Sequence, residues 1–196
     1  KCYNSREFIG TDPVEIVREY ENPRQREVVA LLTSCLSYGR VASIKKSCRD
    51  LIARLQHNPR RFLLGNEKDS IETACTGFKH RFTGPDEIRA LLLGIRDAIE
   101  EYGDLEACFC EYREEHNKTL TAGLNGFVRA VSGQPEGIPH LLPAPNKGSA
   151  CKRLWLFLRW MVRCDAVDPG GWQRVSPSRL VVPMDAHMTR ICRVLE

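Results

Sequence analysis

Apolar residues recur along this chain mostly at intervals of three and four positions, the spacing that places side chains on one face of an α-helix. In residues 23–39 the stripe consists of Val28, Leu31, Leu32, Cys35 and Leu36. Gly39 is expected to end that helix, because glycine readily adopts the left-handed conformation. The same spacing predicts helices over residues 42–55 and 85–102.

Shorter periodic segments predict further helices, and the strongest apolar segment lies near the C-terminal end. The shorter helices are expected within residues 11–21, 59–65, 69–75, 104–116 and 120–133. Residues 133–149 are rich in glycine and proline and predict an irregular connection. Residues 149–163 then carry apolar side chains around much of the helix circumference, so this helix is expected to be the central buried one. No alternating run predicts a sheet, and we expect an all-α fold of about ten short helices in a single domain, residues 1–196.

Composition limits the class of protein. A chain of 196 residues with 42% hydrophobic residues is long enough for one sizeable core. Its longest apolar runs, such as Leu154–Leu158, are far shorter than the roughly 20 residues that a membrane span needs, so we predict no membrane contact and a cytoplasmic location, nucleoid-associated in a bacterium. Because Lys1 is not an initiator methionine and helical periodicity continues to Glu196, we expect a further C-terminal helical segment.

Cysteine and charge distribution narrow the choice of partner. The nine cysteines lie mostly inside helical patterns, which favours reduced, buried thiols. The closest set of potential metal ligands is Cys108, Cys110 and His116, but the first two lie on different sides of a helix, so no metal site is expected. The formal net charge of +4 permits a polyanionic partner, and basic residues crowd residues 147–163 while acidic residues gather in 97–115.

Residues 141–153 contain the first candidate for chemistry. A tight loop with Pro145, Asn146 and Gly148 leads into the apolar helix, and unpaired backbone amides in such a loop can bind a phosphate oxygen. An ordinary interhelical turn is the alternative. Lys152 lies in the first helical turn, where the helix dipole and Arg153 both disfavour the ammonium form, so the free amine is a candidate nucleophile. The alternative is a solvated surface charge.

Asp185 opens the last predicted helix, where the helix dipole favours an anion. It is either a helix N-cap or the partner of Lys152, because an amine and a carboxylate facing one cleft can attack and stabilise a cationic sugar carbon. Of the three tryptophans, Trp155 and Trp160 lie in a core-like pattern. Trp172, in the loop after Gly170 and Gly171, is the better candidate for a contact with a base or with DNA.

The helical hairpin that leads to Lys152, followed by Pro183, Met184, Asp185 and His187, resembles the helix-hairpin-helix glycosylase superfamily that includes endonuclease III. Residues 26–52 are similar to the early helix pair of that superfamily. The segments "YNSREFIGTDP", "SYGRV" and "SACKRLWLFLRWMVR" resemble still more closely the bacterial family called domain of unknown function 2400, over nearly the whole chain.

The resemblance implies a helical bundle with two lobes around a cleft, a barrel over residues 26–135 and a second lobe made of 1–25 and 136–196. It implies Lys152 as the Schiff-base nucleophile and Asp185 as the carboxylate that assists departure of the base. The implied DNA contacts are Tyr38, Gly39, Arg40, Asn146, Lys147, Gly148, Ser149, His187 and Arg190. The four-cysteine iron–sulfur pattern of endonuclease III is absent from this sequence, so no cofactor is expected.

These features lead to three hypotheses. The first is a monomeric DNA glycosylase and abasic-site lyase that acts on a damaged base in double-stranded DNA, such as an oxidised purine, through a Lys152 imine. The second is a non-catalytic module that binds DNA or RNA, in which Lys152 contacts a phosphate and Lys152→Arg preserves function. The third is a helical protein-interaction domain without salt-dependent affinity for nucleic acid.

Overall fold

The computed structural model describes residues 4–112, 120–134, 137–138, 140–184 and 186–195, and for 186–189 and 195 it describes the backbone alone. The described residues form ten α-helices, three short 3₁₀ helices and one pair of two-residue strands, so the predicted all-α class is confirmed. The α-helices are α1 (Val14–Arg18), α2 (Pro23–Cys35), α3 (Val41–Arg54), α4 (Pro59–Gly65), α5 (Lys68–Cys75), α6 (Pro85–Tyr102), α7 (Leu105–Glu111), α8 (Thr121–Ser132), α9 (Lys152–Val162) and α10 (Ala186–Leu195). The 3₁₀ helices are η1 (Arg6–Thr11), η2 (Pro145–Lys147) and η3 (Pro177–Arg179).

Most predicted helices are present, and the exceptions have local causes. Helix α2 ends at Cys35 and does not reach Gly39. The chain turns earlier because the amide of Ser37 donates to Ser34 and the amide of Tyr38 donates to Leu36, which replaces the helical ladder by a tight turn. Gly39 still has a left-handed φ of 99°, as a glycine at the end of a turn can.

The connection between α8 and α9 contains a small hairpin that the sequence did not predict. Strand β1 (Gly137–Ile138) pairs antiparallel with β2 (Leu142–Pro143), with Gly137 opposite Pro143. Glycine is required here because φ of Gly137 is 82° and a Cβ atom would lie 1.9 Å from the carbonyl oxygen of Leu142. Two residues per strand are too short to produce a recognisable alternating pattern.

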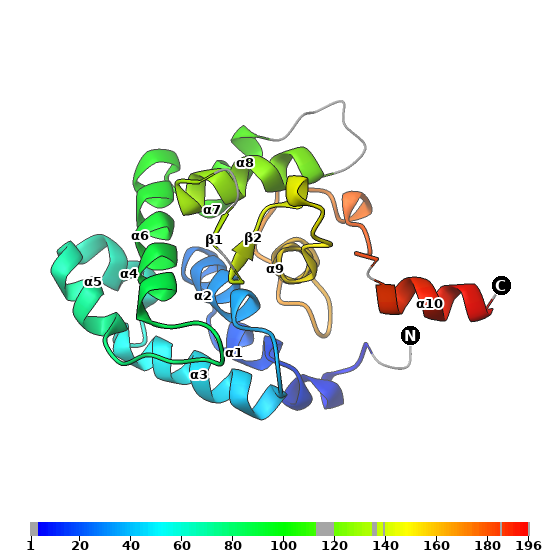
Figure 1. Cartoon of the computed structure of the whole chain (residues 1–196), viewed down its shortest axis with the longest axis horizontal. Coiled ribbons are helices and arrows are strands. Elements are labelled where there is room, and N and C mark those ends of the chain that lie inside the picture. The colour runs from blue at the N-terminus through cyan, green and yellow to red at the C-terminus, as the bar shows by residue number, and fades with distance from the viewer. Residues whose placement is uncertain (1–3, 113–119, 135–136, 139, 185, 196) are drawn as a thin grey trace.

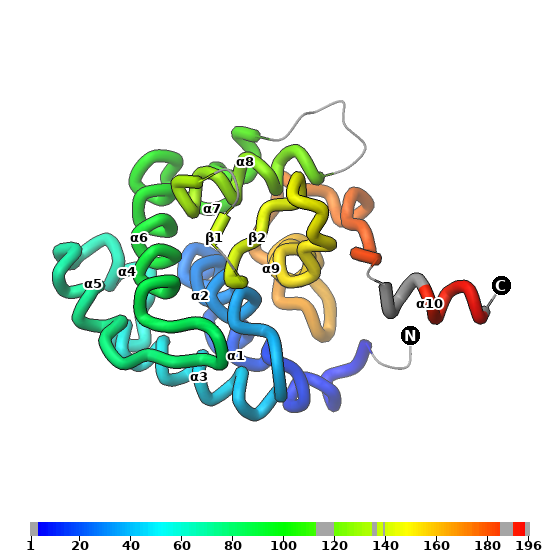
Figure 2. Tube along the Cα trace, in the orientation of Figure 1, coloured from blue at the N-terminus to red at the C-terminus, as the bar shows by residue number. Residues whose placement is uncertain are grey.

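Helices α2 and α9 lie at the centre of the fold, with α1, α3 and α4 to α8 around them (Figure 1). Both central helices carry nearly continuous runs of buried residues, which confirms the prediction of a central buried helix here, although α9 begins at Lys152 and not at residue 149. The buried side chains belong to one hydrophobic cluster that includes residues of both predicted lobes, and the division into lobes stays a prediction. Figure 2 follows the chain from α9 through residues 163–183 toward α10.

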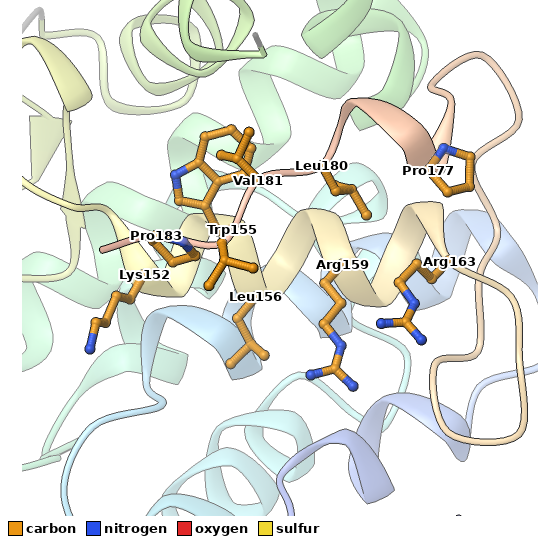
Figure 3. Close-up of a pocket in the computed structure, with 10 residues that line it drawn as sticks. Lys152, Trp155, Leu156, Arg159, Arg163, Pro177, Leu180, Val181 and Pro183 are labelled. Carbon is orange, nitrogen blue, oxygen red and sulfur yellow. The ribbon is translucent and has the colours of Figure 1, made fainter. Parts of the chain in front are cut away.

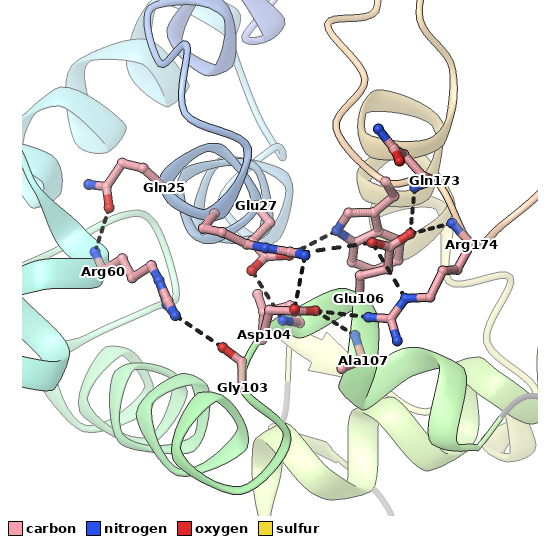
Figure 4. Close-up of polar contacts among 12 residues, drawn as sticks. Gln25, Glu27, Arg60, Gly103, Asp104, Glu106, Ala107, Gln173 and Arg174 are labelled. Carbon is pink, nitrogen blue, oxygen red and sulfur yellow. Dashed lines mark hydrogen bonds and ion pairs between the residues drawn. The ribbon is translucent and has the colours of Figure 1, made fainter.

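Two buried carboxylates fasten the loop after α9 to the rest of the core (Figure 4). Glu27 of α2 is fully buried and accepts from the indole N–H of Trp172 at 2.9 Å and from the amide of Leu105 at 3.2 Å. Glu106 of α7 accepts from the amides of residues 173 and 174, each at 2.6 Å. Residues 172–174 are therefore tied to α2 and α7, which positions the segment that follows them.

The prediction that Trp172 contacts a base is wrong. Its side chain is 4% exposed, and its ring packs against Phe157 and Phe109 with centroid distances of 5.2 and 5.6 Å. A buried indole N–H needs a hydrogen-bond acceptor, and that of Trp172 donates to Glu27. The glycines before Trp172 therefore allow the loop to turn back into the core instead of exposing the ring.

No helix among the described residues is long and apolar enough to cross a bilayer. The described cysteines are all unpaired thiols, and Cys164 and Cys192 are exposed whereas five others are buried. Of the cysteine and histidine set considered as metal ligands, Cys108 is buried in α7 and His116 lies outside the described residues.

The close contact between α6 and α8 predicts that a larger residue in place of Gly94 destabilises the fold. A Cβ atom on Gly94 of α6 would lie 1.5 Å from the carbonyl oxygen of Val131 of α8, so the two helices would have to separate. We expect Gly94→Ala to lower the free energy of unfolding by about 3 kcal/mol, measured by urea denaturation. In Gly65→Ala, where a Cβ would meet nothing within 4 Å, we expect no loss. Equal stability of the two variants would contradict this packing.

The burial of Glu27 predicts a pH-dependent stability. Burial raises the pKa of Glu27 from 4.5 to about 7, although Trp172 and Leu105 donate hydrogen bonds that lower it. The folded protein then holds a proton that the unfolded chain releases between pH 4.5 and 7. The stabilisation is complete below pH 4.5 and is lost as the pH rises through 7, an effect of about 3 kcal/mol.

This dependence is measured from urea midpoints between pH 4.5 and 8. In Glu27→Gln, which keeps the shape and cannot titrate, we expect the fall in this pH window to disappear. Glu67→Gln, which changes an exposed carboxylate at the start of α5, should keep it. If the stability of the wild type changed with pH as little as that of Glu27→Gln, the pKa of Glu27 would be the same in the folded and unfolded states.

Candidate active site

Lys152 is the first residue of α9 and is exposed, although most of the helix behind it is buried. Cys151 before it has a left-handed backbone with φ of 46° and ψ of 38°, and its amide donates to the hydroxyl of Ser149 at 3.2 Å. The buried Cys151 thiol donates to the carbonyl of Pro143 at 3.3 Å. The hairpin is therefore bonded to the residue that precedes Lys152, which fixes where the lysine leaves the fold.

A cavity of about 530 Å³ lies along the exposed edge of α9 (Figure 3). One wall is the helix, and the other is the segment from η3 to Pro183. The lining residues are Lys152, Trp155, Leu156, Arg159, Arg163, Pro177, Leu180, Val181, Val182 and Pro183. The polar side chains in this lining are all cationic and the rest are apolar, so the cavity suits a ligand with a flat apolar part and a negatively charged or acceptor-rich part.

Arg159 and Arg163 are held in place by the loop that follows α9. The Nε atom of Arg159 donates to an oxygen of Asp168 at 2.9 Å, the Nε atom of Arg163 forms an ion pair with the same oxygen at 3.2 Å, and Asp168 is fully buried. A terminal nitrogen of Arg163 also contacts Asp165 at 2.5 Å. Burial raises the pKa of Asp168, and the hydrogen bond from Arg159 counters this change. Paired in this way, the two guanidinium groups keep a fixed orientation at the cavity edge.

The structure does not describe the side chains of all residues predicted for the site. Asp185 lies outside the described residues, as does the side chain of His187, so their placement stays a prediction. Arg190 is exposed on α10. The described part of the chain reaches the cavity wall at Pro183, two positions before Asp185 in the sequence.

The expectation of unpaired amides in the loop before α9 is wrong for three residues. The amides of Lys147 and Gly148 donate to Ala144 and Pro145, and the amide of Asn146 donates to the Asn125 side chain at 3.0 Å. Residues 146–149 are nevertheless all exposed. The phosphate contact predicted for this loop therefore stays a prediction that rests on exposed side chains such as Lys147, and not on the amides of residues 146–148.

The turn between α2 and α3 is close to the start of α9. Gly39 and Arg40 are exposed, whereas Tyr38 is half-buried and its hydroxyl contacts the carbonyl of His80 at 2.9 Å and the hydroxyl of Thr83 at 2.7 Å. Because the hydroxyl of Tyr38 is bonded within the fold and its ring lies 4.6 Å from that of His80, Arg40 is the more accessible of the two side chains predicted to enter a DNA gap.

Arg153 is a residue whose role the sequence analysis missed. Its guanidinium donates to the carbonyl of Cys35, the last residue of α2, and to the carbonyl of His140, both at 2.5 Å. It also lies 5.0 Å from the centre of the Tyr38 ring. Arg153 thus joins the start of α9 to the end of α2 and to the hairpin. No local sequence signal identifies this contact, since its partners are backbone carbonyls far away in the chain.

Arg159 and Arg163 were also missed, although a signal was available. They follow Lys152 at seven and eleven positions, which places all three on one face of a helix. Three cations spaced along one edge of an otherwise apolar helix predict a shared solvent-facing surface.

No curated protein and no solved structure matches this sequence. The profile of a family described as "Protein of unknown function (DUF2400)" matches residues 12–196, which include α9, the cavity wall and every residue predicted for catalysis. On this match, the chain belongs to the DUF2400 family.

Proposed function

We propose that this protein is a DNA glycosylase with abasic-site lyase activity that acts through the amine of Lys152. The observation that carries the proposal is the position of Lys152, an exposed primary amine at the first turn of a buried helix, on the wall of a cationic and apolar cavity. The opposite wall of that cavity ends at Pro183, just before Asp185 in the sequence.

The cavity properties fit a nucleotide turned out of its helix. Flipping a nucleotide costs a few kcal/mol, and contacts between cations and the DNA backbone must offset that cost. Lys147 and Arg40 are exposed on the two turns near the start of α9 and can supply such contacts. The apolar side chains Leu156, Leu180 and Val181 then offer a surface for the face of a base.

In the proposed reaction, the amine of Lys152, in its unprotonated form, attacks C1′ of the target nucleotide as the bond from C1′ to the base breaks. The base leaves with the electron pair and takes up the proton that the amine loses. Asp185, as a carboxylate, stabilises the positive charge that develops on the sugar. Opening of the sugar ring then gives an imine between Lys152 and C1′.

Strand cleavage follows from the imine. Loss of a proton from C2′ expels the 3′ phosphate by β-elimination, and water hydrolyses the imine to regenerate the Lys152 amine. This sequence needs no oxidant, reductant or bound cofactor, and borohydride can intercept it by reducing the imine to a stable amine.

The test of Lys152 is borohydride trapping on duplexes with an abasic site or with a panel of damaged bases. We expect wild-type protein to form the covalent adduct, and Lys152→Ala and Lys152→Arg to lose it by at least about 100-fold, since arginine stays protonated. Lys68→Ala is the matched control because Lys68 is also the exposed first residue of a helix, α5.

Two results would contradict the proposal. Trapping that survives Lys152→Ala would place the nucleophile elsewhere. Salt-dependent binding that Lys152→Arg preserves, without trapping of the wild type on any substrate, would favour the non-catalytic nucleic-acid module.

The role of Asp185 can be distinguished from that of Lys152, because the two residues are expected to act in different steps of the reaction. Because the carboxylate is needed while the base departs, Asp185→Asn should slow excision of a damaged base by about 100-fold. Trapping on a preformed abasic site, where no base remains to leave, should change far less. Asp69→Asn, which alters an exposed carboxylate in the first turn of α5, serves as the control. Equal losses in both reactions would assign Asp185 to the fold or to DNA binding.

A further inference from the structure

Phe82 is the tip of a tight turn that holds an aromatic ring in solvent. The turn is closed by two backbone hydrogen bonds, from His80 to Thr83 at 2.9 Å and from Thr83 to His80 at 2.8 Å. Arg81 between them has a left-handed φ of 53°. The Phe82 side chain is 73% exposed. An exposed ring forgoes about 2 kcal/mol of apolar burial, so its flat apolar surface is available to a ligand.

The base of this turn is rigidly mounted. The side chains of His80 and Thr83 are only 3% and 1% exposed, and both residues bond to Tyr38. One ring nitrogen of His80 lies 3.0 Å from the Ser47 hydroxyl, and the other lies 3.1 Å from the carbonyl of Tyr38. Phe82 therefore projects from a fixed platform, and little conformational entropy is lost when a ligand contacts it.

The surroundings of Phe82 are cationic. The Arg81 guanidinium lies 5.7 Å from the centre of its ring, and the His140 ring lies 6.4 Å away. Burial lowers the pKa of His80, and the nearby charges of Arg81 and Arg153 lower it further. The guanidinium groups of Arg81 and Arg153 thus place positive charge near the turn, which favours a polyanionic ligand such as a nucleic acid.

The turn also lies beside the start of α9. Arg153, the residue after Lys152, donates to the carbonyl of His140, whose ring neighbours Phe82. Arg81 packs over Gly39, where a Cβ atom would lie 2.8 Å from its side chain. The turn between α2 and α3, the turn that carries Phe82 and the first turn of α9 thus form one continuous surface.

We propose that Phe82 is a stacking site for an unpaired base in the nucleic-acid strand whose target nucleotide is held at Lys152. The inference rests on the nucleic-acid part of the proposed function. Every base has a flat π-face that can stack on an aromatic ring, and the cations beside the ring can pair with phosphates. A base is accessible for this contact only where it is unpaired. The preferred substrate is therefore a strand with a bulged, gapped or single-stranded base, rather than a continuous duplex.

The experiment compares two DNAs by fluorescence anisotropy, one fully paired and one with a single unpaired 2-aminopurine, matched in total phosphate number. We expect Phe82→Ala to weaken binding of the unpaired DNA by about 10-fold or more, and to change binding of the paired duplex by less than about twofold. Phe82→Trp should retain the affinity. The dependence of log affinity on log salt should stay unchanged, because no phosphate contact is removed.

Leu64→Ala is the matched control, since Leu64 of α4 is also an exposed large apolar residue, at 39%. The 2-aminopurine fluorescence reports stacking directly, and we expect wild type and Phe82→Trp, but not Phe82→Ala, to change it. Equal affinities of wild type and Phe82→Ala for the unpaired DNA would overturn the stacking site. Absence of nucleic-acid binding by the wild type at low salt would also overturn it and would leave a protein partner for this ring.

The stacking site and the enzymatic proposal fail separately. If Phe82→Ala loses affinity for the unpaired DNA while wild type gives no borohydride adduct, the stacking site stands and the lyase does not. If the adduct forms and Phe82→Ala binds as wild type does, the lyase stands and the stacking site does not.

Discussion

The packing of α9 against α2 is the constraint on which the rest of the structure depends. Both helices bury most of their residues in the same core. Helix α9 packs against α2 more extensively than against any other element. A helix buried in this way cannot rotate or slide without losing many apolar contacts. Its one exposed edge is therefore fixed in direction, and Lys152 is fixed at the end of that edge.

Charges on the exposed edge of α9 are stabilised by the loop that follows it. Two arginines one helical turn apart repel each other, and the buried carboxylate of Asp168 between them offsets that repulsion. The loop itself is held by hydrogen bonds from residues 172–174 to the buried carboxylates of Glu27 and Glu106. The cavity wall after this loop thus depends on two acidic residues that take no part in the proposed chemistry.

At the start of α9, one arginine connects three segments that are distant in the chain. Arg153 binds the end of α2, the hairpin and the ring of Tyr38, and Tyr38 in turn holds the turn that carries Phe82. The candidate amine and the candidate stacking ring are consequently supported by the same contacts.

Long amphipathic segments could be predicted from the sequence, because helical periodicity is a local property: α3, α6 and α9 appear where their apolar spacing places them. The same spacing placed Lys152 at the start of a central buried helix. Only the tertiary structure showed that Trp172 belongs to the core, that Arg153 binds distant carbonyls and that Phe82 is exposed. These outcomes depend on which segments meet in space, and neither local spacing nor composition carries that information.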